Sequence, residues 1–80
     1  MTLDHIYRIV DDVIERCRSD GSTALADDLS QSKQLGSSAL EILGAIRSCF
    51  IKNREQVAHA VGDPKVADVI EFIDRAFGRT

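Results

Sequence analysis

Two cysteines and two histidines carry the most versatile chemistry in this sequence of 80 residues. Cys17 and Cys49 lie far apart, outside any CxxC motif and away from any pair of histidines. Together with His5 and His59 they reach the four ligands of a structural zinc site, but their spacing matches no zinc motif. We therefore predict no metal site and no cofactor. Both thiols are expected to be reduced and buried as small apolar side chains.

The same four side chains would in principle allow a thiol nucleophile activated by a histidine. Both cysteines, however, fall on apolar stripes of predicted helices, where burial raises the pKa of a thiol and leaves it inert. The sequence also lacks the GxSxG, P-loop, GxGxxG, HExxH and EF-hand motifs. We therefore predict that the protein is not an enzyme.

A short segment of glycine and serine, Gly36-Ser37-Ser38, leads into a predicted helix. Backbone N–H groups at the start of a helix can hold an anion, but the full phosphate-binding pattern is absent. One glycine and two serines are also what is needed to turn the chain and cap the helix. We prefer this capping interpretation.

Acidic side chains form the most prominent charged clusters. The chain has 13 acidic and 10 basic residues and a net charge of −3, which argues against a general nucleic-acid binder. Such clusters are commonly no more than solvated helix faces. The functional interpretation is electrostatic steering toward a basic partner, with these candidate partner-binding residues: Asp11, Asp12, Glu15, Asp68, Glu71 and Asp74.

Gly44 is a second feature with two interpretations. A glycine inside a helix costs about 1 kcal/mol relative to alanine, so its presence needs a reason. The helical projection places it near Leu40, Arg47 and Ile51, away from the main buried stripe. Either another helix of the same chain packs closely there, or these four residues form the seam of a homo-oligomer.

Helical periodicity predicts the elements that carry these residues. Leu3 to Cys17 form one apolar stripe at spacings of three and four, with Thr2 as the cap and Gly21 after the end. A shorter and less apolar helix is predicted from Thr23 to about Ser32, with Ser22 as its N-cap. A polar loop over residues 30–38 follows it.

The segment over residues 38–51 is apolar around most of its circumference, so we expect it in the middle of the fold with neighbours on several sides. Ser38 and Glu41 form a capping box at its start. Its end allows two interpretations. Either one helix continues to Gly62, which we favour, or Asn53 caps a separate short helix that ends at Val61.

The last predicted helix starts at Asp63-Pro64, with Asp63 as the N-cap, and Gly78 closes it. The segments together predict an all-α fold, a compact bundle of about four helices (three long, one short) with no β-sheet, in one domain over residues 1–80. The predicted core consists of Ile6, Val10, Val13, Ile14, Ile42, Leu43, Ile46, Phe50, Val69, Ile70, Ile73 and Phe77.

Two classes of function are disfavoured by the same pattern. A helix-turn-helix over residues 23–51 would present only Arg47 and Lys52 to DNA. No apolar run approaches the roughly 20 residues of a membrane span, and the acidic start does not resemble a signal peptide. We therefore expect a cytoplasmic protein that binds neither nucleic acid nor membrane.

The small size of the chain points toward association. A domain of this length hides only about 60% of the surface that its unfolded chain exposes, so a partner is a common source of added stability. We expect a small acidic protein-binding module without an active site, most concretely an immunity- or antitoxin-type inhibitor of a basic toxin. The alternative is a homo-oligomeric structural or regulatory helical protein, such as a homodimer.

Overall fold

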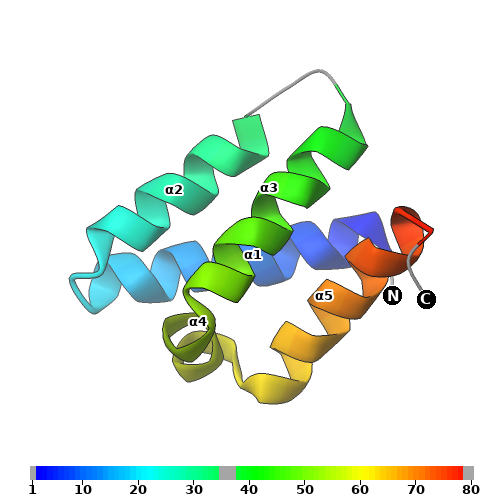
Figure 1. The fold of residues 1–80 in the computed structure, drawn as a ribbon. Helices are drawn as coiled ribbons and strands as arrows, with labels where there is room; N and C mark the ends of the chain where they lie inside the picture. Colours follow the sequence, from blue (N-terminus) through cyan, green and yellow to red (C-terminus); the bar gives the residue numbers. More distant parts are fainter. Residues whose placement is uncertain (1, 35–37, 79–80) are drawn as a thin grey trace.

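The computed structural model describes residues 2–34 and 38–78, and these residues form an all-helical fold (Figure 1). The predicted class is confirmed for this part of the chain, with five helices in place of about four and no strand. None of the described helices is long and apolar enough to cross a bilayer. The helices are α1 (Leu3–Ser19), α2 (Thr23–Gln34), α3 (Ala39–Lys52), α4 (Arg54–Val61) and α5 (Asp63–Ala76).

Helix α1 forms as its periodicity predicts. The Oγ1 atom of Thr2 accepts a hydrogen bond from the backbone N–H of His5 at 3.3 Å, which is the predicted cap. Ile9 lies outside the predicted stripe but is buried with the rest of the inner face. Gly21 turns the chain after the helix with φ +82°, a conformation that glycine adopts without a steric penalty.

Helix α2 extends to Gln34, beyond its predicted end near Ser32. Ser32 is buried, and its hydroxyl donates a hydrogen bond of 2.8 Å to the carbonyl oxygen of Asp28, one turn earlier. This bond within the helix satisfies the hydroxyl, so the polar side chain of Ser32 can be buried. The predicted loop is therefore shorter than expected, and Leu35, Gly36 and Ser37 lie outside the described residues.

A break at Asn53 separates α3 from α4, so the continuous helix that we favoured is wrong and the two-helix alternative is right. Asn53 has φ −118° and ψ 35°, which is not helical. Its side-chain amide donates to the carbonyl oxygen of Cys49 at 3.0 Å and makes no capping bond to α4. The asparagine thus ends the first helix instead of capping the second. An apolar pattern cannot reveal this local competition for the backbone.

Helix α5 begins one residue earlier than predicted, with Gly62 (φ +91°) in the N-cap position in place of Asp63. The Asp63 carboxylate lies in the first turn, where it still interacts favourably with the helix dipole. Gly78, with φ +75°, follows the helix as predicted.

The five helices pack so that α1 contacts α2 and α4, while α3 lies between α2 and α5. Figure 1 shows α3 in front of α1, with α2 and α5 on its two sides. The expectation that this helix has neighbours on several sides is confirmed, because α2, α4 and α5 all contact α3. One side of this helix faces solvent, because no other described helix crosses it there.

The core is close to the predicted one, with three corrections. Phe77 is 40% exposed, and Ile42 and Ile70 are only half-buried. Phe77 follows the end of α5, and its ring lies beside Gly44 of α3 with part of its surface exposed. The core also includes buried residues that the prediction did not name: Ile9, Cys17, Leu25, Ala26, Leu29, Cys49, Val57 and Val66.

Candidate functional site

Both cysteine thiols are buried and free. Burial raises the pKa of the Cys17 thiol, and the negative charge of Asp20 raises it further. Burial likewise raises the pKa of the Cys49 thiol, with a further contribution from Asp28. A raised pKa keeps each sulfur protonated at neutral pH, when it is a poor nucleophile.

The two histidines differ in their positions relative to these thiols. His59 of α4 and Cys17 of α1 line the same small pocket of about 200 Å³, together with polar side chains of α4 and of the turn between α1 and α2. His5 is exposed in the first turn of α1. Among the described residues, no group of three or more His, Cys, Asp or Glu side chains is placed to hold a metal ion. The shared pocket therefore offers neither an activated thiol nor a ligand set.

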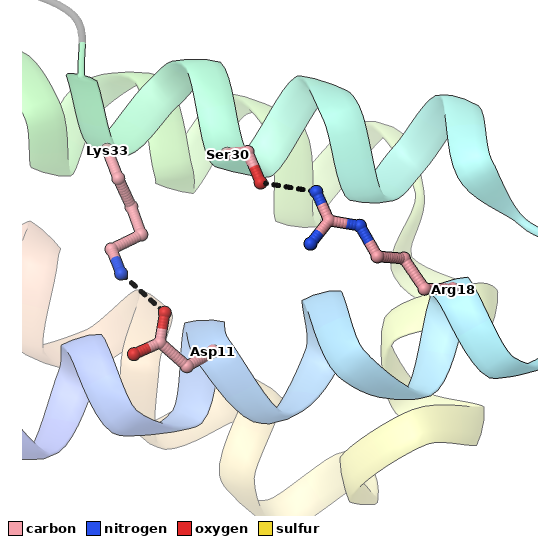
Figure 2. A network of polar contacts seen from close by, with 4 residues as sticks. All are labelled: Asp11, Arg18, Ser30 and Lys33. Atoms are coloured by element: carbon pink, nitrogen blue, oxygen red, sulfur yellow. Dashed lines mark hydrogen bonds and ion pairs between the residues drawn. The ribbon is translucent and has the colours of Figure 1, made fainter.

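The three acidic residues of α1 that were predicted to bind a partner point in two directions. Asp11 forms an ion pair with Lys33 of α2, and Arg18 donates to the Ser30 hydroxyl at 3.3 Å, so both residues bridge α1 and α2 (Figure 2). Asp12 and Glu15 lie on the side toward α4 and α5. Neither forms an ion pair with a described residue.

The three acidic residues of α5 that were predicted to bind a partner also differ in their contacts. Asp74 accepts a bond of 2.6 Å from Arg47 Nε of α3, and both side chains are 27% exposed. Glu71 pairs with Arg75, four residues along the same helix, at 2.5 Å. Asp68 is exposed and has no ion-pair partner among the described side chains. The two predicted clusters are thus not two uniform acidic faces.

Asp12 and Glu15 of α1 lie on the side toward α5, and Asp68 of α5 is one turn after Lys65, which lines the same depression as they do. We call the surface formed by these three carboxylates the α1/α5 surface. Asp12 and Glu15 line an open depression of about 690 Å³ that Lys65 of α5 also lines. Lys65, Asp68 and Phe72 follow one another at spacings of three and four, so they share one face of α5.

Sequence reasoning missed the basic members of the α1/α5 surface. Arg16 and Lys65 line the depression together with the two carboxylates of α1. The sequence did contain a signal for Lys65, because it stands three residues before Asp68 and therefore shares a helix face with it. The surface is therefore acidic toward Asp68 but carries both signs of charge in the depression.

The predicted oligomer seam lies on the solvent side of α3. Leu40 and Ile51 are 47% and 46% exposed. Arg47 is held by Asp74 as described above. Gly44 is covered, because a Cβ at this position would meet the ring of Phe77 at 3.4 Å. This contact agrees with packing within the same chain, although a side chain and not a backbone makes the close approach.

The Ser38 cap of α3 is present. Its Oγ accepts a hydrogen bond of 3.2 Å from the backbone N–H of Glu41. This is the first half of the predicted capping box, and it occupies one of the N–H groups that an anion would have needed. The other two residues of the anion-binding alternative, Gly36 and Ser37, lie outside the described residues.

No protein-family model matches this chain, and neither a curated protein nor a solved structure matches it. Its function is therefore inferred from its residues and their geometry.

Proposed function

We propose that this chain is a small cytoplasmic protein-binding module without an active site. In its most concrete form it is an immunity- or antitoxin-type inhibitor that docks its acidic side on a basic toxin. The carrying observation is that the carboxylates of the α1/α5 surface form no ion pair with a described residue. The other three predicted carboxylates each pair with a basic side chain of the same chain: Asp11, Glu71 and Asp74.

Several features support this proposal. Carboxylates without an ion pair present their full charge to an approaching molecule, and exposed charges act over about 8–10 Å at physiological ionic strength. The two free buried thiols fit a reducing compartment. Their raised pKa values fit a protein that does not use them in catalysis.

The test is the association rate with a basic partner captured from the native organism, with priority for products of neighbouring genes. A variant carrying Asp12→Asn, Glu15→Gln and Asp68→Asn removes the three unpaired carboxylates of the α1/α5 surface. We expect it to lower kon and to flatten the salt dependence of kon, because steering by exposed charge is screened by salt.

A matched control carries Asp4→Asn, Asp27→Asn and Glu55→Gln, which are exposed acidic residues outside the α1/α5 surface. It changes the net charge by the same amount and should leave kon close to that of the parent. Equal effects of the two triple variants would show that only net charge matters and would overturn the assignment of this surface.

One observation favours a second candidate function, a homo-oligomeric structural or regulatory helical protein. The two most exposed large apolar side chains of the described chain, Leu40 and Ile51, stand on the same side of α3. Apolar side chains that recur on one exposed helix face are typical of an interaction surface.

A further inference from the structure

The large apolar side chains that the described fold leaves exposed gather around one helix. Leu40 and Ile51 are on α3, and the ring of Phe77 lies against Gly44 between them. Figure 1 shows α3 between α2 and α5. We call the surface formed by Leu40, Gly44, Ile51 and Phe77 the α3 ridge.

The α3 ridge has a charged track beside it with the same length. Leu40 and Ile51 are eleven residues apart, which is about three turns, so they stand on one line along the helix. Glu41 and Lys52 are also eleven residues apart and follow a second line next to the first. Both are exposed, and neither forms an ion pair with a described residue. The negative charge is thus at the start of the helix and the positive charge at its end.

We propose that the α3 ridge binds a second copy of this chain, with the two α3 helices antiparallel about a two-fold axis. This inference rests on the second candidate function and does not involve the α1/α5 surface. Antiparallel pairing brings Leu40 of each copy to Ile51 of the other. The same rotation brings Glu41 of each copy to Lys52 of the other, because a two-fold axis keeps the charged track on the same side of the interface.

The charge pattern selects this orientation. In a parallel pair the two-fold axis would run along the helices and place the two charged tracks on opposite sides of the interface, so neither Glu41 nor Lys52 would meet an opposite charge of the other track. Only the antiparallel arrangement brings both residues into opposite-charge pairs. Arg47 adds no unpaired charge beside the ridge, because Asp74 of the same chain already neutralises it.

The size of the ridge sets the strength of the association. Helix α3 has 14 residues, and a contact along a single helix of this length is smaller than the roughly 1,000 Å² of a stable interface. We therefore expect reversible dimers with a Kd in the range of about 10–500 μM.

Sedimentation equilibrium from about 5 μM to 1 mM, a range that brackets this Kd, tests the proposal. The parent protein should approach twice its monomer mass at the highest concentration. Glu41→Lys and Lys52→Glu should each weaken the dimer at least about tenfold, since each places like charges together twice. The double variant Glu41→Lys/Lys52→Glu should restore it, because the pairs return with exchanged signs.

The double variant also separates association from folding. Both changes oppose the helix dipole of α3, so the double variant carries both penalties and its recovery cannot come from a more stable monomer. Glu55→Lys, a charge reversal in the first turn of α4, serves as the matched control and should leave the dimer unchanged.

The outcomes distinguish the inference from the function on which it rests. A protein that stays monomeric at all concentrations overturns both the dimer and the second candidate function. A parent that dimerises, with a double variant no better than the single variants, overturns the antiparallel α3 contact but leaves self-association standing. Neither result tests the first proposed function, which is measured by kon for a basic partner and depends on the α1/α5 surface.

Discussion

Helices α1 and α3 both bury an apolar stripe in the core, but they present opposite kinds of outer face. The outer face of α1 carries charged side chains such as Asp4, Arg8, Asp12 and Glu15, all exposed. The outer face of α3 carries Leu40 and Ile51. Charged side chains gain from water, whereas half-exposed leucine and isoleucine still have apolar area to bury. The outer face of α1 therefore leaves little apolar area exposed, whereas the outer face of α3 keeps apolar area in contact with water.

The largest expected effect concerns the inner faces of α1 and α3, which are both apolar and buried. Cys17 of α1 and Cys49 of α3 are both buried, so a thiol reagent reaches them only after the fold opens. With the stability of about 5 kcal/mol or more that is usual for small domains, labelling should be at least about a thousandfold slower in the native than in the denatured protein. Rapid stoichiometric labelling of either thiol in the native state would contradict the buried inner face.

The thiols also give this stability a pH dependence with a defined sign. Their pKa values are raised above 9.0 in the folded protein, whereas in the unfolded chain they are not. The stability that the protonated thiols contribute is fully present below their pKa in the unfolded chain. It is lost as the pH rises toward their pKa in the folded protein. The free energy of unfolding should therefore fall above about pH 9, and a Cys17→Ala/Cys49→Ala variant should lose part of that fall.

The next effect compares two neighbouring positions of α3, one on its buried face and one on its exposed face. Phe50 is fully buried and Ile51 is half-exposed. Phe50→Ala should lower the free energy of unfolding by about 3–5 kcal/mol, because it leaves a cavity in the core. Ile51→Ala should change it by no more than about 0.5 kcal/mol. Denaturant melts at a few micromolar, where self-association is negligible, provide the measurement. Similar losses in the two variants would mean that the faces are assigned wrongly.

A smaller effect with the opposite sign is expected at Gly44. Gly44→Ala should raise the free energy of unfolding by up to about 1 kcal/mol, the difference in helix propensity. The new methyl group meets only the ring of Phe77, which stands at the surface and can shift. In a Phe77→Ala background the gain should be at least as large. A net loss in the parent background would show that the ring is fixed and that the glycine is required for its contact.

The smallest effects separate the ion pairs at the edges of the two helices. Arg47 and Asp74 are both mostly buried, whereas Asp11 and Lys33 are more exposed. Double-mutant cycles with Arg47→Met/Asp74→Asn and Lys33→Met/Asp11→Asn should give couplings of about 1 kcal/mol or less, with the first pair the stronger and the second near zero. The ranking fails if the Asp11–Lys33 coupling is the larger of the two in 0.15 M salt.

The sequence predicted those parts of the fold that depend on periodicity and capping. The stripe of α1, the Thr2 cap and the Ser38 cap are local, and all three are present. The break at Asn53 depends on a hydrogen bond between its side chain and the backbone of Cys49, which no hydrophobic pattern encodes. Nor does any pattern encode how far the bundle extends, so the exposure of Phe77 was unforeseen.

The candidate surfaces were predictable only as lists of residues. Acidic side chains at neighbouring positions look alike in a sequence, yet Asp11 faces Lys33 and Asp74 faces Arg47, while Asp12 and Asp68 face solvent. Which carboxylate acquires a partner depends on how helices distant in sequence are placed. That Leu40 and Ile51 share one helix face, in contrast, follows from their spacing, although the sequence left open whether another part of the chain covers that face.

The bend at Asn53 also governs the dimensions of the molecule. Joined without interruption, α3, Asn53 and α4 would make a helix of 23 residues, a rod about 34 Å long. That length is close to the 35 Å of the longest axis of the described structure, and a straight helix could not turn back to place Val57 in the core beside α1. The change of direction at Asn53 therefore lets α4 contact both α1 and α5.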